Sequence, residues 1–458
     1  MQIHPSDNVE VRDDGQKYAL TFIKKGDNII KYGFPIGHAL CDIKVGEFVS
    51  PHNLKSNLSG IDNWEYNPYS EPHLQKNSAT FKGYLRKNGD IGIRNEIWII
   101  PTVGCINDVA KLIANKTGAK ALTHPYGCSQ LGGDLLTTQK FLCGLIKHPN
   151  AAAVLVLSLG CENNRIELMK EMLGEIDEER IRFLSLQDCE DEVAEAVAII
   201  EALKEIISND KRVDVPISKL RIGVKCGGSD GYSGITANRL VGMVSDKFFR
   251  YDATILMSEI PEVFGAEPIL LSRSDSVETF NKCANMINSF RQYFLDHGES
   301  IGENPSPGNI AGGISSLEEK SLGCVQKAGT VTLRGALDFG EVPYGKSGLY
   351  MVNGPGNDQV ACTALACSSA HIILFTTGRG TPYCSVIPTL KISTNNALFE
   401  KKPQWIDFNA GSILTGADKD KLTDELFNLC IETSEGRLTK GEEKGYYDIA
   451  IFKDGVTL

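Results

Sequence analysis

Residues 220–238 read Leu220-Arg-Ile-Gly-Val-Lys-Cys226-Gly-Gly-Ser-Asp230-Gly-Tyr-Ser-Gly-Ile-Thr-Ala-Asn238 and change character twice. An apolar run ends at Cys226, glycines dominate as far as Gly234, and apolar residues then recur at helical spacing over 235–249. This pattern predicts a strand, a tight turn and a helix. In open α/β sheets such turns bind ligands, because a helix N-terminus offers unpaired N–H groups to an anion. Taken alone, the stretch is equally typical of a glycine-rich connection with a capping Asp or Ser.

Three further stretches have the same form. Apolar runs at 97–103, 119–123 and 153–159 each end in a turn that carries a cysteine, and a helix-like segment follows each turn. Strands that alternate with helices predict a mainly parallel sheet with right-handed crossovers. Because the carboxyl ends of parallel strands meet at one edge, we expect the turns of Cys105, Cys128 and Cys161 to share that edge.

The composition along the chain predicts an α/β protein in three parts. Residues 1–57 consist of short strands with turn residues, which indicates a small all-β module, and 58–80 have the Asn, Ser and Pro content of a linker. A middle α/β domain is predicted over 81–215 and a C-terminal α/β domain over 216–458. Within the latter, 277–295 predict a long helix, 303–313 are too rich in Gly and Pro to predict a regular element, and the tail beyond 410 predicts a helix and a last strand.

The charge of the chain excludes several classes of partner. The 458 residues have a net charge of -11, and their Lys and Arg residues are dispersed, so we expect neither nucleic acid nor anionic membrane as a partner. No window approaches 18 apolar residues and the first residues do not resemble a signal peptide, so we expect a cytoplasmic protein. The 13 cysteines, with no C-x-x-C pair, are then expected to be reduced thiols.

The turns contain thiols, carboxylates, amides, a histidine and several cations. The sequence has no G-x-G-x-x-G fingerprint, which disfavours dinucleotide binding. A polyhydroxy acid held by a divalent metal fits these residue types, because a metal can stabilise the enediolate formed when a base removes the proton beside a carboxylate. An α/β enzyme of another class remains the alternative from these residues alone.

Longer motifs surround these turns. They are Arg94-Asn-Glu-Ile-Trp-Ile-Ile-Pro-Thr-Val-Gly-Cys105, Tyr126-Gly-Cys-Ser-Gln-Leu-Gly132, Leu159-Gly-Cys-Glu-Asn-Asn164, Pro261-Glu-Val-Phe-Gly-Ala-Glu267, Asn304-Pro-Ser-Pro-Gly-Asn309, Lys320-Ser-Leu-Gly-Cys324 and Thr377-Gly-Arg-Gly-Thr-Pro382. With the stretch at 226–238, they make the chain resemble the altronate/galactarate dehydratase family over nearly its whole length.

The resemblance implies a fold and an activity. It implies an N-terminal β-clip (SAF-like) module, a middle domain that forms a homodimer, and a C-terminal variant of a Rossmann-like sheet. The implied reaction is dehydration of D-altronate, a sugar acid, to 2-dehydro-3-deoxy-D-gluconate in hexuronate catabolism, with Fe²⁺ or Mn²⁺. Action on another sugar acid such as galactarate, or C–S lyase activity, is the alternative within the family. A non-enzymatic sugar-acid sensor would need a basic DNA-binding helix, which the sequence lacks.

The β-module departs from the family pattern at two places. Gly15-Gln16-Lys17 replaces an expected Gly-His-Lys, and Ser50 stands where a second histidine often precedes His52. A direct catalytic role for this module is therefore not expected, although it could close over the site. Cys384 also replaces an expected glycine.

Candidate site residues follow from the chemistry of β-elimination, which needs an acid and a base. We expect His124, Lys320 and Glu162 to be catalytic. The expected metal ligands are Cys128, Cys161, Cys226, Asp230, Glu262 and Cys324, because thiolates suit iron and carboxylates suit hard cations. The expected substrate-binding residues are Arg379, Ser129, Gln130, Asn163, Ser229, Asn238 and Thr377. Of these, Arg379 is expected to bind the substrate carboxylate through two hydrogen bonds from its guanidinium group.

Each of these assignments has a structural alternative. His124 could cap the following helix, and Lys327 could replace Lys320 as the base. Glu259 and Asp358 are further candidates for a hard cation, and the cysteines could be small packing residues.

Overall fold

The computed structural model describes residues 1–73 and 75–458. The N-terminal module consists of two three-stranded antiparallel sheets, in the orders β1-β2-β5 and β3-β4-β6. Alternate residues point inward, and Val9, Ile29 and Ile36 are fully buried. The all-β module is therefore confirmed. Its strands are β1 (Val9–Val11), β2 (Lys17–Ala19), β3 (Asn28–Lys31), β4 (Phe34–Ala39), β5 (Phe48–Val49) and β6 (Leu54–Lys55).

The middle part is built on a four-stranded parallel sheet of order β10-β9-β11-β12. Its central strands are almost entirely apolar because helices cover both faces. The strands are β9 (Glu96–Pro101), β10 (Lys120–Ala121), β11 (Ala151–Ser158) and β12 (Ile181–Ser185). The helices are α1 (Asn107–Thr117), α2 (Gly132–Ile146), α3 (Ile166–Leu173) and α4 (Glu192–Ile207). A small antiparallel sheet of β13 (Val213–Pro216), β7 (Thr80–Leu85) and β8 (Ile91–Gly92) joins this part to the next.

The C-terminal part contains a seven-stranded parallel sheet of order β16-β17-β15-β14-β18-β19-β20. The predicted strand, turn and helix at 220–249 form its central strand β14 (Arg221–Cys226), a turn, and α5 (Ala237–Arg250). The other strands are β15 (Thr254–Met257), β16 (Leu333–Leu337), β17 (Leu349–Val352), β18 (Ile372–Thr377), β19 (Thr389–Ser393) and β20 (Phe408–Asn409). The order reverses between β14 and β18, which is where open α/β sheets place their ligands.

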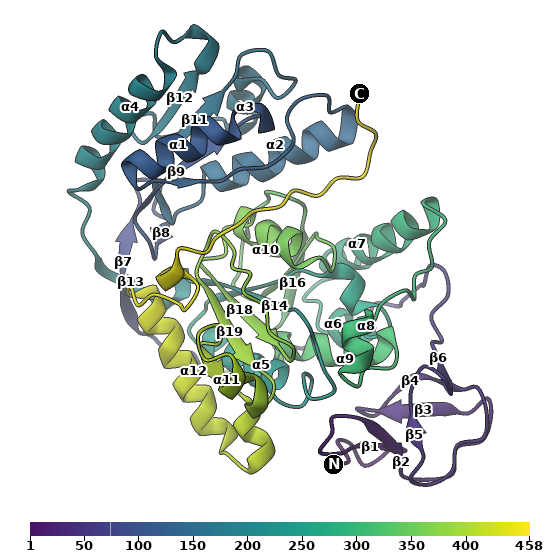
Figure 1. Ribbon diagram of the computed structural model, residues 1–458. Coiled ribbons are helices and arrows are strands. Elements are labelled where there is room, and N and C mark those ends of the chain that lie inside the picture. The colour runs from purple at the N-terminus through teal and green to yellow at the C-terminus, as the bar shows by residue number, and fades with distance from the viewer. Residues whose placement is uncertain (74) are drawn as a thin grey trace.

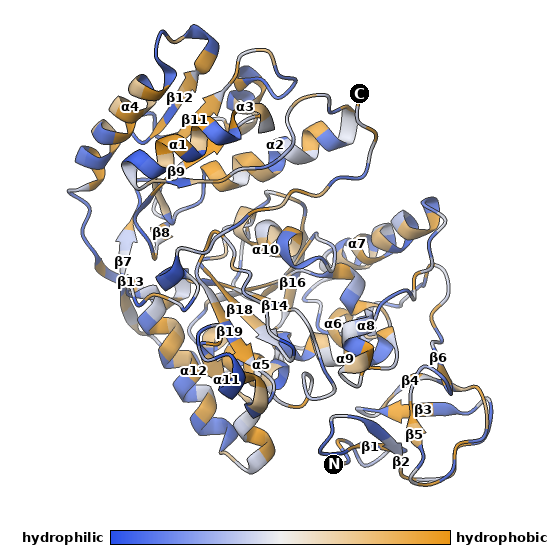
Figure 2. Ribbon diagram, in the orientation of Figure 1, coloured by the Kyte–Doolittle hydropathy of each residue, from blue (hydrophilic) through white to orange (hydrophobic). Residues whose placement is uncertain are grey.

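Helices cover this sheet on both sides, as Figure 1 shows. They are α6 (Glu267–Leu271), α7 (Val277–Asp296), α8 (Pro307–Ala311), α9 (Leu317–Cys324), α10 (Asp358–Cys367), α11 (Asn396–Lys401) and α12 (Lys419–Ser434). Figure 2 shows the strands of both parallel sheets mainly in hydrophobic colours and α4 and α12 in alternating ones. Among the described helices, none is long and apolar enough to cross a membrane.

Two details of the predicted fold are wrong. The segment 303–313 contains the short helix α8, because Ser306 accepts a hydrogen bond from the backbone N–H of Asn309 and the Asn309 side chain completes a capping box. The tail forms no strand beyond β20, although isolated bridges pair Asp448 with Ser385 and Thr457 with Gln130. It instead crosses from the C-terminal part to α2 of the middle part (Figure 1).

The N-terminal module is anchored to the C-terminal part at α9. Lys17 Nζ and Lys31 Nζ both bind the Glu319 carboxylate, at 2.8 and 2.6 Å, and all three side chains are at most 2% exposed. Ser316 Oγ also donates to the carbonyl of Ile36 at 2.6 Å. The module therefore lies against α9, which also carries Lys320, the residue after Glu319.

Candidate functional site

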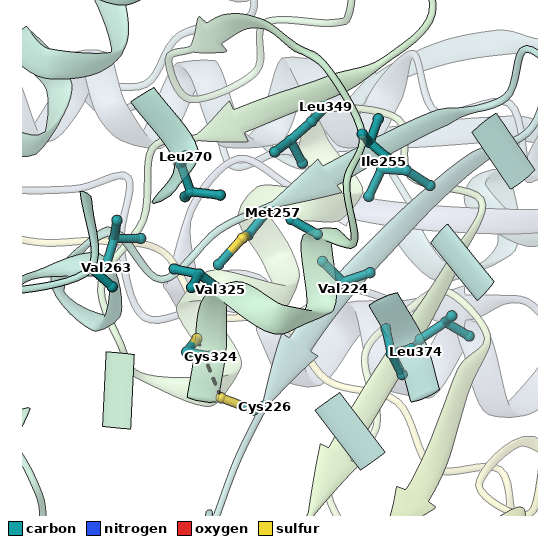
Figure 3. Packing of buried hydrophobic residues seen from close by; sticks show 14 of the residues in the cluster. Val224, Cys226, Ile255, Met257, Val263, Leu270, Cys324, Val325, Leu349 and Leu374 are labelled. Atoms are coloured by element: carbon teal, nitrogen blue, oxygen red, sulfur yellow. Dashed lines mark hydrogen bonds between the residues drawn. The ribbon is translucent and has the colours of Figure 1, made fainter. Parts of the chain in front are cut away.

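Two thiols and two carboxylates meet in the core at the carboxyl end of the central strands. Cys226 ends β14, Glu259 and Glu262 follow β15, and Cys324 ends α9. One ligand atom from each lies within 4.8 Å of the others, and none of the four residues is more than 3% exposed. Figure 3 shows the sulfur atoms of Cys226 and Cys324 facing one another, 3.7 Å apart. We call these residues the thiol–carboxylate group.

The buried Lys225 and Lys327 and the slightly exposed Lys320 surround the thiol–carboxylate group. Lys225 Nζ bonds to the Glu259 carboxylate and lies 2.8 Å from Asp358 Oδ1. Lys327 Nζ lies 3.2 Å from Glu259 and 2.8 Å from Cys324 Sγ, and Lys320 Nζ lies 2.9 Å from Glu262 Oε1. With Asp358, three ammonium groups therefore balance three carboxylates.

These contacts shift the ionisation of the group. Burial alone would raise the pKa of Glu262, but the ammonium groups, Lys320 first, lower the pKa to about 2. Burial alone would likewise lower the pKa of Lys320, but the Glu262 carboxylate raises it above its usual value. Lys320 is therefore an ammonium ion at neutral pH and can donate a proton. The neighbouring acidic groups also outweigh desolvation at Lys327, whose pKa is raised as well.

A cavity of ≈ 600 Å³ opens beside the group. Cys226, Glu262 and Lys320 contribute to its wall, so the buried charges reach the cavity on one side. The Lys320 ammonium also donates to Asn304 Oδ1 at 3.0 Å and to Asn309 Oδ1 at 3.2 Å. An aromatic wall of the same cavity consists of Phe290, Tyr293, Phe294 and Phe452. The cavity thus combines a polar, charged face with an apolar one, as small-molecule sites commonly do.

The donor set fits a divalent transition metal. The separations from Cys226 Sγ are 3.2 Å to Glu262 Oε2 and 3.7 Å to Glu259 Oε1, and Cys324 Sγ lies 3.8 Å from Glu262 Oε2. Separations of this size between ligand atoms suit a four-coordinate ion with metal–ligand bonds of about 2.0–2.3 Å. A doubly charged ion with two thiolates would also leave the balanced charge of this region unchanged. Thiolate and carboxylate together suit iron and manganese.

The structure brings part of the predicted site together. Cys226, Glu262, Cys324 and Lys320 share the group or its cavity, as do the alternatives Glu259 and Asp358. Arg379 lies nearby and exposed, since its Cβ is 3.1 Å from the position that a Cβ on the cavity-lining Gly228 would take.

Four predicted residues of this domain have other contacts. Thr377 Oγ1 accepts from the backbone N–H of Gly380, at 2.8 Å. Asn238 donates to the carbonyl of Gly323 and accepts from Thr376, so packing uses its amide. Asp230 is no member of the metal group: its carboxylate accepts from Ser233, Thr394 and Asn395, and burial raises its pKa. Ser229 is buried, and its carbonyl accepts from Asn309.

The structure does not show His124 capping the following helix, because α2 has Leu131 at its N-cap and no side-chain cap. The Nε2 atom of His124 donates to the carbonyl of Pro101 at 2.8 Å, and its Nδ1 accepts from the backbone N–H of Tyr126 at 3.2 Å. Burial lowers the pKa of His124 to about 4. Both ring nitrogens bind backbone groups, so the geometry does not support its expected catalytic role.

Glu162 also organises a turn. Its carboxylate accepts from Thr102 Oγ1 at 2.5 Å and from the backbone N–H groups of Leu159 and Gly160. It lies in the middle part, as do Cys128, Cys161, Ser129, Gln130 and Asn163, and none of these residues lines the cavity in the described structure. The single site expected from the sequence therefore divides between two sheets.

Sequence reasoning missed Lys225, Asn304 and Asn309. Lys225 lies inside an apolar strand, and a single lysine there gave no signal of a buried ion pair. The two asparagines belong to a motif that was singled out, but only the fold shows that they hold Lys320.

Comparison with known proteins agrees with this architecture. Residues 2–57 match the altronate/galactarate dehydratase SAF domain, 83–208 the D-galactarate dehydratase/altronate hydrolase second domain, and 217–457 the D-galactarate/altronate dehydratase C-terminal domain. The chain is 48% identical to the altronate dehydratase of Bacillus subtilis (strain 168), covering 98% of this chain and 94% of that one. It is 45% identical to the altronate dehydratase of Escherichia coli (strain K12), with the same coverage.

A more distant relative is galactarate dehydratase (L-threo-forming) of Escherichia coli (strain K12), 29% identical over 94% of this chain and 87% of the relative. Three consecutive domain matches cover most of the chain, and the similarity to the altronate dehydratases extends over 98% of it. The chain therefore belongs to the altronate/galactarate dehydratase family.

Proposed function

We propose that this protein is a hydro-lyase that converts D-altronate to 2-dehydro-3-deoxy-D-gluconate and water. The observation that carries the proposal is the thiol–carboxylate group with its three lysines, open on one side to a polar cavity. Two relatives that are 45% and 48% identical over nearly the whole chain are named altronate dehydratases, which supports altronate as the substrate.

The chain's own residues divide the work of β-elimination as follows. The reaction removes the proton beside the carboxylate and expels the hydroxyl of the next carbon. Lys320 is protonated and faces the cavity, so it donates a proton to the leaving hydroxyl. The cavity-lining Asp358 carboxylate accepts the proton from the carbon beside the substrate carboxylate. Asn304 and Asn309 orient Lys320, and Arg379 binds the substrate carboxylate at the rim with its bidentate fork.

Cys226, Glu259, Glu262 and Cys324 would hold a ferrous or manganous ion, which would supply electrostatic stabilisation to the enediolate. The aromatic wall excludes water from the side of the substrate that it contacts. We also propose that the protein is a cytoplasmic homodimer that associates through the middle domain.

The test is an anaerobic assay of chelator-treated protein that is supplied in turn with Fe²⁺, Mn²⁺, Mg²⁺ or no metal. D-altronate, galactarate and D-gluconate are compared as substrates by detection of the 2-keto-3-deoxy product. We expect turnover of D-altronate that returns with Fe²⁺ or Mn²⁺. Full turnover by metal-free protein would contradict the metal, and a preference for galactarate would contradict the substrate.

A pair of cysteine variants links the activity to the site. Cys226→Ser should lose metal and turnover together, because oxygen replaces a thiolate ligand. Cys283→Ser, which changes a buried cysteine of α7 outside the thiol–carboxylate group, is the matched control and should retain both.

A further inference from the structure

Three exposed cysteines lie at one edge of the middle sheet. In the described chain, the exposed thiols are Cys41, Cys105, Cys128 and Cys161. The last three follow β9, β10 and β11 at the carboxyl ends of these strands. Because β9 lies between β10 and β11, the turn of Cys105 lies between the other two turns. The proposed dehydration at the thiol–carboxylate group uses none of these thiols.

Backbone contacts hold the three turns against one another. The N–H of Gly104 donates to the carbonyl of Tyr126 at 2.8 Å, which joins the turns of Cys105 and Cys128. The N–H of Asn164 donates to the carbonyl of Gly127 at 3.0 Å, which joins the turns of Cys128 and Cys161. Asn164 Nδ2 also donates to the carbonyl of Thr102 at 3.0 Å and connects the remaining pair. Each cysteine thus lies within three residues of a contact between turns.

Gly127 makes this close approach possible. Its φ of +103° is unfavourable for other residues, and a Cβ there would lie 2.0 Å from the carbonyl oxygen of Thr102. The turns therefore form one rigid edge.

Each turn also contributes an amide that is only half used. Asn107 donates to the carbonyl of His124, Gln130 accepts from the N–H of Gly127, and Asn164 donates to the carbonyl of Thr102. The other polar atom of each amide, Asn107 Oδ1, Gln130 Nε2 and Asn164 Oδ1, is buried without a partner among the described residues. Gln130 and Asn164 are at most 2% exposed. Buried polar atoms of native proteins are normally hydrogen-bonded, so the donor Gln130 Nε2 indicates a missing acceptor at this edge.

The spacing of the sulfur atoms excludes a compact single-ion site. Among the described residues, only the thiol–carboxylate group brings three or more candidate ligand atoms within 4.8 Å of one another. The sulfurs of Cys105, Cys128 and Cys161 are therefore too spread to enclose one ion, whereas an iron–sulfur cluster takes each thiolate on a different iron.

We propose that the middle domain binds a [4Fe–4S] cluster through Cys105, Cys128 and Cys161. Each thiol loses its proton and ligates one iron, and the fourth iron has no protein ligand. Its open position suits an oxygen ligand, such as a hydroxyl or carboxylate. The Gln130 amide can donate to a cluster sulfide, and hydrogen bonds of this kind tune the potential of a cluster. The C-terminal segment flanks the site, because the N–H of Leu458 donates to the carbonyl of Ser129.

The test begins with full-length protein that is reconstituted under anaerobic conditions. Ferrous and ferric iron are supplied in equal amounts, and sulfide is supplied at twice the amount of either ion. This mixture contains the atoms and electrons of the cluster. We expect about four irons and four acid-labile sulfides per chain above the metal content of the untreated protein, with a broad absorption band in the visible range. Protein that binds iron but no acid-labile sulfide would overturn the proposal.

Variants then locate the cluster. The triple change of Cys105, Cys128 and Cys161 to Ser should abolish sulfide binding, whereas Cys41→Ser, the matched exposed control, should retain it. Cys226→Ser should also retain the sulfide, which separates this proposal from the metal of the proposed active site. Equal sulfide content in the triple variant and the wild type would contradict the assignment.

A labelling experiment tests the same proposal with the wild-type protein alone, so it does not depend on whether a variant folds. In the wild type, iodoacetamide should modify all four exposed cysteines before reconstitution and only Cys41 afterwards. Unprotected Cys105, Cys128 and Cys161 in reconstituted protein would overturn the proposal.

Discussion

At the scale of single residues, Lys320 joins the charged group to the cavity. Its side chain is 9% exposed and contacts Glu262, Asn304 and Asn309. We predict that Lys320→Met lowers the turnover number by roughly 10²- to 10⁴-fold, the range for loss of a positioned acid or base. Steady-state kinetics with D-altronate measures the effect, and the exposed Lys346→Met is the control. Wild-type turnover in a folded Lys320→Met protein would remove the residue from the mechanism.

His124 supports the opposite prediction at the same scale. Because both of its ring nitrogens bind backbone groups of its own region, we expect His124→Asn to destabilise the protein by about 1–3 kcal/mol, as for buried groups left unpaired. Turnover per folded molecule should stay unchanged. Urea unfolding and the altronate assay separate the two effects, with the exposed His52→Asn as control. Lost turnover at unchanged stability would restore the catalytic assignment.

At the scale of elements, the short helix α9 links the N-terminal module to the site. It carries Glu319, which binds Lys17 and Lys31, next to Lys320, and it ends at Cys324. Burial alone would raise the pKa of Glu319, but the two ammonium groups lower it to about 2. The contribution of Glu319 to stability is therefore complete above pH 4.5 and is lost as the pH falls toward 2.

We predict that Glu319→Gln destabilises the protein by roughly 3–5 kcal/mol at pH 7, because it leaves two buried ammonium groups without their carboxylate. Urea unfolding measures the change. Glu10→Gln removes a partly exposed carboxylate from the same module and should cost at most about 1 kcal/mol. Similar unfolding curves for both variants would show that the anchoring ion pairs contribute little.

At the scale of the whole molecule, two buried histidines lie between the middle and C-terminal parts. His148 Nε2 donates to the carbonyl of Ala370 at 2.9 Å, and His371 Nε2 donates to the carbonyl of Ile91 at 2.8 Å. Burial lowers the pKa of His148 to about 4 and that of His371 well below 6.5. Between pH 6.5 and 4 the unfolded chain therefore binds more protons than the folded chain at both positions.

The free energy of unfolding should consequently fall as the pH drops from 6.5 to 4, by up to about 1.4 kcal/mol per pH unit for each histidine. Denaturation at several pH values measures this slope. His148→Gln should reduce the slope, and the exposed His52→Gln should leave it unchanged. An identical slope in wild type and His148→Gln would exclude His148 as a source of the acid sensitivity.

The sequence by itself determined the elements and much of their order. The strand, turn and helix at 220–249, the long helix α7 and the parallel character of both large sheets follow from apolar periodicity and glycine placement, which act over a few residues. The resemblance of the motifs determined the family in the same way. Cys226, Glu262 and Cys324 were predicted together because each ends or follows a predicted element in a motif, and the structure places them side by side.

Only the tertiary structure decided which turns meet. Cys226 and Cys324 are 98 residues apart and touch because β14 lies beside β15 and α9 packs against the turn that follows β15. The turns of His124 and Glu162 have the same local pattern but belong to another sheet, and their side chains bind backbone groups. A local pattern specifies that a polar turn ends a strand, whereas strand order and packing specify what that turn faces. For this reason the residue types of the site could be predicted, and its division between two sheets could not.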